Sequence, residues 1–235
     1  MRQLALPFIL LGVLALAGCA PTAEPSSAEE ASAPAPTVEM GEGELLVVHT
    51  FPGGGEAVWM VNGEEVARTS EAGETAGFFE VPAGLDSLTV AVEGSASTAT
   101  ELEVQSDARY VAYLHMLPDG SPAVVTGDGM TQPVGDATWG RFVNLVPNLE
   151  NVELFNTSSC LGDILQGRRY GGVIRYSSHH PWAGHSTACS NGQPVAGLPS
   201  LSGTGTAYMY ASAAQSILLY LADEGPALMS VDETP

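Results

Sequence analysis

The chain has 235 residues, and its seven basic residues, all arginine, stand against 27 acidic ones, which gives a formal net charge of -20. So few cations exclude nucleic-acid binding by phosphate neutralisation, and an apolar content of 45% excludes disorder throughout the chain. The 27 glycines and 16 prolines also argue against a helix-rich fold, because both residues interrupt helices.

Residues 1–18 have the layout of an export signal. Arg2 gives a positive start, and an apolar run of about 13 residues follows, shorter than the roughly 20 needed to span a bilayer. The run ends in Leu16-Ala17-Gly18-Cys19, which resembles the bacterial lipobox. The resemblance implies that residues 1–18 are removed and that Cys19 becomes an acylated N-terminus. An ordinary signal peptide that contains a cysteine, or an uncleaved anchor, is the alternative.

An acylated Cys19 would anchor the protein to a membrane. A single acyl chain gives only marginal attachment, so two or three chains on Cys19 would be needed to hold the protein there. No Asp follows Cys19, so we expect an exported protein on the outer membrane if the host has two membranes.

Residues 19–42 are rich in Ala, Pro, Thr, Glu and Ser without apolar periodicity. This composition is typical of a disordered linker, with a reach of roughly 60–70 Å.

The rest of the chain reads as two copies of one unit, at residues 43–127 and 138–230, with a joint at about 127–138. Leu45–Pro52 matches Gly140–Pro147, and Asp107–Tyr113 matches Gly205–Tyr210 later in the chain. Short runs of β-branched and aromatic residues between turn signals predict an all-β chain of two tandem immunoglobulin-like β-sandwich domains. In the first copy we expect strands at residues 45–50, 57–61, 77–81, 87–93, 100–104 and 110–114.

Three motifs of the first copy resemble a known family. They are Val-Val-His-x-x-Pro ending at Pro52, the Asn62-Gly63 turn, and Val-Pro-Ala-Gly over residues 81–84. Together they resemble the family called domain of unknown function number 4397. The resemblance implies secreted or lipid-anchored bacterial proteins, often with tandem immunoglobulin-like repeats, and it implies no established activity. In the second copy Asn144 replaces His49, and residues 180–184 replace the Val-Pro-Ala-Gly motif.

Two cysteines remain once Cys19 is set aside. Cys160 and Cys189 both lie in the second copy, and an exported protein meets an oxidising environment. We expect a disulfide between them, and a thiolate metal site or two free thiols are the alternatives.

Histidines are the remaining candidates for chemistry. His179, His180 and His185 form a cluster that could supply three imidazole ligands to a metal, or that is simply a polar loop. His49 and His115 lie in apolar strands, where we expect hydrogen-bonded core residues.

The sequence predicts a lipid-anchored, non-enzymatic binding or envelope-organising module without a cofactor. Its expected partners are the membrane, through the lipid on Cys19, and an unknown envelope protein or glycan, with no nucleic acid. The alternative is a metal-binding envelope lipoprotein that uses His179, His180 and His185.

Overall fold

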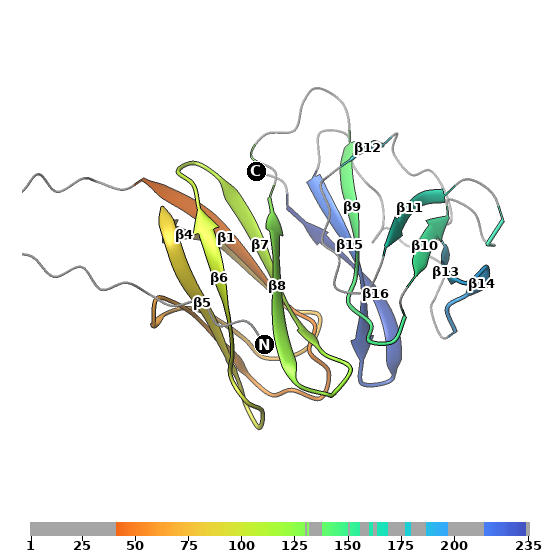
Figure 1. Ribbon diagram of the computed structural model, residues 1–235, viewed down its shortest axis with the longest axis horizontal. Coiled ribbons are helices and arrows are strands. Elements are labelled where there is room, and N and C mark those ends of the chain that lie inside the picture. Colours follow the sequence, from red (N-terminus) through yellow and green to blue (C-terminus); the bar gives the residue numbers. More distant parts are fainter. Residues whose placement is uncertain are drawn as a thin grey trace, which may run out of the picture. The chain divides into compact units, whose positions relative to one another are not determined.

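The first repeat is a β-sandwich, as the computed structural model of the chain shows (Figure 1). Its strands are β1 (Glu42–His49), β2 (Ala57–Val61), β3 (Glu64–Thr69), β4 (Thr75–Pro82), β5 (Gly84–Val92), β6 (Thr98–Val104), β7 (Arg109–Met116) and β8 (Pro122–Asp128). Sheet A has the order β4-β1-β7-β8, and sheet B has the order β3-β2-β5-β6. Alternate residues of both sheets point into one core, where Trp59, Leu88 and Leu114 are fully buried.

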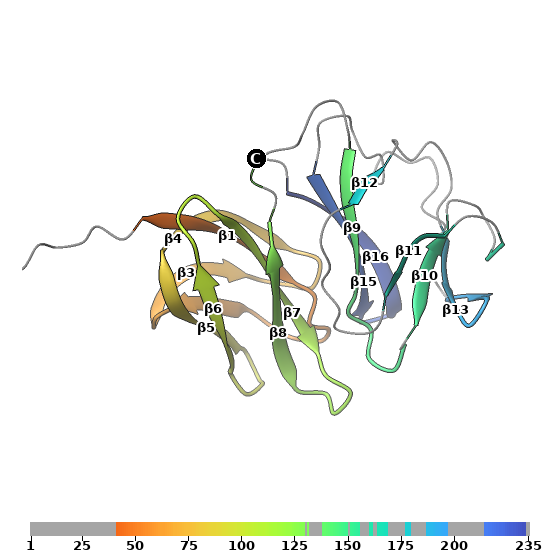
Figure 2. The same cartoon turned by 45° about the horizontal axis from the view of Figure 1, so that its top comes forward.

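The second repeat has the same strand order as the first (Figure 2). Its strands are β9 (Thr138–Asn144), β10 (Val152–Phe155), β11 (Ile164–Arg168), β12 (Ser177–His179), β13 (Thr187–Ser190), β14 (Gln193–Pro194), β15 (Ala214–Ala222) and β16 (Gly225–Asp232). Sheet C has the order β12-β9-β15-β16, and sheet D has the order β11-β10-β13-β14. Phe142, Leu154 and Ile217 are buried in the core between these sheets. Each strand of one repeat therefore has a counterpart in the other.

Every regular element that the structure describes is a strand, which confirms the prediction of an all-β chain. The described residues all belong to one compact unit. Among them there is no helix with the length and apolar character needed to cross a membrane. They are residues 41–129, 131, 138–149, 151–155, 160–161, 164–168, 177–179, 187–196 and 214–233.

Two predicted turn signals have the backbone geometry that their residues favour. Asn62 and Gly63 have φ angles of 52° and 84°, which suits a tight hairpin between β2 and β3. Gly84, the last residue of the Val-Pro-Ala-Gly motif, has a φ of 140° that a side chain would strain. It stands where the chain passes from β4 in sheet A to β5 in sheet B.

Part of the predicted strand assignment was wrong. Strands β3 and β8 were not predicted, because β3 is rich in Glu and Arg and β8 begins at a proline. The match of residues 107–113 to residues 205–210 was also wrong. β7 pairs in parallel with β1, and the strand that pairs in parallel with β9 is β15, which begins at Ala214. Tyr208 and Tyr210 of the second copy lie outside the described residues.

The inner strands of sheets A and C are buried on both faces. In β1, Leu45 and Val47 point into the first sandwich, whereas Leu46 and Val48 point to its outside. The outward set packs with residues of sheet C in a separate apolar cluster, which we call the inter-repeat core. Its buried members are Leu46, Val48, Val111, Tyr113, Val143, Leu145, Leu218 and Val231. Burial on both faces explains the apolar runs Leu45–Val48 in β1 and Ile217–Leu219 in β15.

The two ends of β1 lie at opposite ends of the first sandwich. Glu42, the last residue of the predicted linker, begins the strand, and His49 ends it. At about 3.3 Å per residue, these ends are roughly 23 Å apart. The turn between β15 and β16 lies at the His49 end, because Gly53 donates a backbone hydrogen bond of 2.7 Å to Asp223 Oδ1. Both repeats therefore contribute loops to the end that lies away from Glu42.

Candidate functional site

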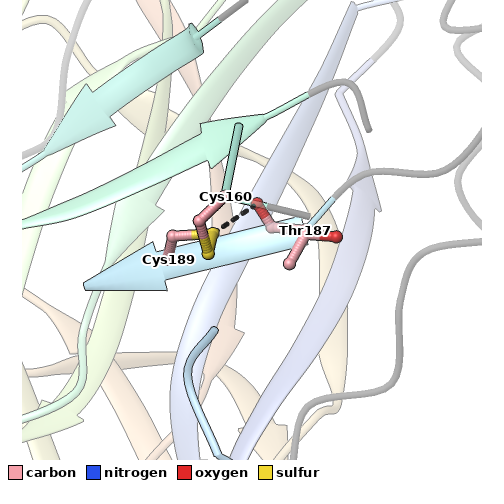
Figure 3. The surroundings of a disulfide bond; sticks show 3 residues. All are labelled: Cys160, Thr187 and Cys189. Carbon is pink, nitrogen blue, oxygen red and sulfur yellow. Dashed lines mark hydrogen bonds between the residues drawn. A yellow bond between two sulfur atoms is a disulfide. The ribbon is translucent and has the colours of Figure 1, made fainter. Parts of the chain in front are cut away.

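The predicted disulfide between Cys160 and Cys189 is present (Figure 3). The sulfur atoms are 2.02 Å apart and the Cα atoms 5.8 Å apart, with a sequence separation of 29 residues. Cys189 is fully buried in β13, so the bond fixes Cys160 to sheet D. Its Sγ also lies 3.9 Å from the carbonyl oxygen of Thr187, but a disulfide sulfur carries no hydrogen to donate. Neither cysteine is thus a free thiolate for a metal.

The histidine cluster falls largely outside the described residues. His179 is the last residue of β12, which pairs with β9 opposite Thr138. His180 and His185 lie outside the described residues, and so does Cys19. Where the structure describes the chain, it brings no three His, Cys, Asp or Glu residues into a group that could hold a metal.

A polar cluster that the sequence did not predict lies beside the inter-repeat core. Arg141 of β9 and Glu233, which follows β16, form an ion pair whose side chains are 1% and 0% exposed. The Nη2 of Arg141 donates to both carboxylate oxygens of Glu233, at 3.0 and 2.8 Å. Its Nε donates to Ser216 Oγ at 2.7 Å, and its Nη1 donates to the backbone oxygen of Asp128 at 2.7 Å.

The first repeat completes this cluster with Tyr113. The hydroxyl of Tyr113 donates to Glu233 Oε1 at 3.0 Å and lies 3.1 Å from Ser216 Oγ. Ser216 Oγ also donates to Glu233 Oε1. We call these four residues, Tyr113, Arg141, Ser216 and Glu233, the buried quartet. The quartet links sheet A to sheet C by hydrogen bonds.

Burial governs the protonation of the quartet. It raises the pKa of Tyr113 well above its ordinary range, and the neighbouring Glu233 carboxylate adds to this effect, so the hydroxyl stays a donor. Burial also raises the pKa of Glu233, and Arg141 opposes that rise. A charged pair without access to solvent cannot meet a substrate in this arrangement. The quartet is therefore suited to joining the repeats and not to catalysis.

One signal for the quartet was present in the sequence. Arg141 directly precedes the apolar pair Phe142-Val143, in the segment that matches Leu45–Pro52 of the first copy. A buried arginine requires an acidic partner. No spacing rule pointed to Glu233, because it follows a strand that was not predicted.

The two repeats place different polar residues at the end of their first strand. Asn144 is fully buried and donates to the backbone oxygen of Leu149 at 2.6 Å, so it holds the turn that follows β9. His49 is equally buried, but neither ring nitrogen makes a well-formed hydrogen bond. The expectation of a hydrogen-bonded core histidine was therefore wrong for His49. Burial lowers the pKa of His49, and Glu74 and the backbone of Phe51 oppose that effect.

Grooves open at both ends of the part of the chain that the structure describes. One, of about 340 Å³, lies at the Glu42 end and includes Asn62 and Glu80 in its lining. The other, of about 530 Å³, lies at the opposite end and is formed by both repeats. Its lining includes Glu71 of the first repeat and Glu224 of the second.

No protein-family model matches the chain, and no curated protein sequence is significantly similar to it. The resemblance to domain of unknown function number 4397 therefore stays a prediction based on the motifs of the first repeat.

Proposed function

We propose that the protein is a lipid-anchored component of a bacterial cell envelope that works by binding a partner, with Cys19 as the acylated residue. The Leu16-Ala17-Gly18-Cys19 ending and the tether composition that follows it support the anchor. In this proposal the protein is exported, and its two repeats belong to the immunoglobulin-like class. The host membrane is the outer one where two membranes exist.

One observation carries the binding role. Loops of both repeats meet at the end of β1 that lies away from Glu42, and the bond between Gly53 and Asp223 fixes them to one another. The linker joins the first repeat at the Glu42 end, so the loops at the other end of β1 are not the point of attachment. Loops held on a rigid scaffold are the common place for recognition in β-sandwich proteins. The groove shared by Glu71 and Glu224 is the surface that we assign to contact with an envelope protein or a glycan.

The anchor is tested by expressing the full chain in a bacterium that is fed labelled palmitate. We expect label and membrane association in the native sequence, and loss of both in Cys19→Ser. Intact mass after extraction should give a chain that starts at Cys19 and carries acyl groups. Label that persists in Cys19→Ser, or an unmodified soluble chain, would contradict the anchor.

The binding surface needs its own test, which is made on the chain without its lipid. Candidate envelope glycans are titrated onto the native protein and onto Glu71→Gln/Glu224→Gln, with Glu101→Gln/Glu103→Gln on sheet B as the matched control. We expect the first pair to weaken binding and the control pair to leave it unchanged. Equal effects of both pairs would contradict the assignment of the groove.

The metal-binding alternative rests only on His179, His180 and His185 in the sequence. No observation on the described residues favours it, so we do not advance it as a second function.

A further inference from the structure

The buried quartet breaks an otherwise close equivalence between the two repeats. Leu46 pairs with Val111 in sheet A, and the corresponding pair in sheet C is Arg141 with Ser216. The first repeat is apolar where the second repeat carries a charge and a hydroxyl. Gly129, next to Arg109, occupies the place that Glu233 has in the second repeat.

The hydroxyl of Tyr113 makes the first repeat complementary to the polar residues of the second repeat. Its counterpart in the second repeat is Leu218, and the acceptors for its hydroxyl are on the second repeat. Two copies of sheet A packed face to face would bury two such hydroxyls against Leu46 and Val111. An unpaired buried hydroxyl costs free energy, so this arrangement is disfavoured.

Pairing of two copies of sheet C is disfavoured for a related reason. Each face would bury its own Arg141 and Glu233, and neither face would offer the phenol that completes the cluster. Buried ion pairs are weak sources of stability, but they can specify which surfaces meet and in which register. Only the pairing of sheet A with sheet C satisfies every member of the quartet.

We propose that the buried quartet is a recognition element that selects sheet C of the same chain as the partner of sheet A and holds the two sheets in one register. The apolar residues of the inter-repeat core attract the two sheets to each other but do not fix one register, because methyl groups can pack in many ways. The quartet supplies direction, because only one register lets the Tyr113 hydroxyl reach Glu233 and Ser216 while Arg141 reaches the backbone oxygen of Asp128.

The test compares the native quartet with an apolar one in the full chain. The variant Tyr113→Phe/Arg141→Leu/Ser216→Val/Glu233→Leu makes the facing surfaces of sheets A and C apolar at all four quartet positions. Spin labels at Ser87→Cys and Gln193→Cys, which are exposed on sheets B and D, report the distance between the repeats by double electron–electron resonance. Cys19→Ser keeps the anchor cysteine from taking label in all samples.

We expect one narrow distance distribution for the native quartet. The apolar variant should stay folded and give a broadened or multiple distribution, or a dimer in sedimentation. Arg68→Gln/Glu65→Gln, which removes an exposed ion pair, is the matched control and should keep the narrow distribution. A folded apolar variant that is monomeric with the native distribution would overturn the proposal.

A second variant decides the matter if the apolar one does not fold. Glu233→Gln keeps the size of the side chain and leaves each sandwich its own core. It should also broaden the distance distribution, because the Tyr113 hydroxyl of the first repeat loses its charged acceptor on the second repeat. An unchanged narrow distribution in Glu233→Gln would reject the quartet as the element that sets the register.

Discussion

Arg141 and Glu233 form an ion pair with 1% and 0% of their side chains exposed, in which Nη2 of Arg141 donates to both carboxylate oxygens of Glu233. The pair lies at the boundary between two β-sandwiches. Removing two charges from water is costly, and their attraction offsets this cost only when the remaining donors and acceptors are also paired. Ser216, Tyr113 and the backbone of Asp128 provide those partners. The charges of Arg141 and Glu233 can therefore be buried because these neighbours pair their remaining donors and acceptors.

Glu233→Ala should lower the free energy of unfolding by about 3–5 kcal/mol, because it leaves the Arg141 guanidinium buried without its counter-ion. Urea denaturation followed by circular dichroism measures the loss. Glu65→Ala removes a carboxylate from the exposed ion pair with Arg68 and should leave the urea midpoint unchanged. Equal midpoints for Glu233→Ala and the native chain would show that the buried pair does not stabilise the fold.

The fold could be predicted from sequence where local chemistry determines it. Asn62-Gly63 favours a tight hairpin, and the alternating residues of β2 and β5 place Trp59 and Leu88 in a core. Strand β3 has a polar sequence because it lies at the edge of sheet B, and its position depends on pairing with β2. The match of residues 205–210 to β7 relied on a similar order of residues in the two copies, whereas the strand equivalent to β7 is β15, which is defined by its pairing with β9.

The buried quartet could be predicted only in part, for a similar reason. Arg141 stands out as a charge in an apolar strand. Ser216 and Glu233 are residue types that are common on protein surfaces, so the sequence alone does not show that they are buried partners of Arg141. The cysteine pair was predictable, because two cysteines in an exported chain leave few choices. A cluster assembled from β7, β9, β15 and the residue after β16 has no local sequence pattern.

Cys160→Ser/Cys189→Ser should destabilise the protein by about 3–4 kcal/mol, since the chain-entropy model applies to a loop of this length. The measurement is the urea midpoint of the double variant, compared with the native chain before and after reduction. Reduction should shift the native midpoint and leave the double variant unchanged. A native midpoint that does not move when mass spectrometry shows full reduction would rule out a stabilising role.

Thr69→Val should cost about 1–3 kcal/mol, because it leaves the indole N–H of Trp59 buried without an acceptor. The two groups are 3.0 Å apart, and neither residue is exposed. Thr69→Ser is the matched control, since it keeps the hydroxyl and should cost less than Thr69→Val. Thermal unfolding followed by tryptophan fluorescence distinguishes the two, and identical losses would mean that the methyl group, not the hydrogen bond, is important here.

His49 should make the stability of the protein sensitive to mild acid. Burial lowers its pKa below the ordinary value of 6.5, so the unfolded chain takes up a proton at a higher pH than the folded chain does. The free energy of unfolding therefore falls as the pH drops through 6.5, by at most about 1.4 kcal/mol per pH unit. His115 acts in the same direction, because burial lowers its pKa too.

His49→Asn separates the two histidines, because it installs the residue that the second repeat has at the equivalent place, while His115 remains. Urea titrations at about pH 7.5 and about pH 5.5 give the free energy of unfolding of both proteins. We expect His49→Asn to lose less stability than the native chain between these two values. An equal loss in both proteins would assign the acid sensitivity to His115 and to the carboxylates, and would show that the pKa of His49 is the same in the folded and unfolded chains.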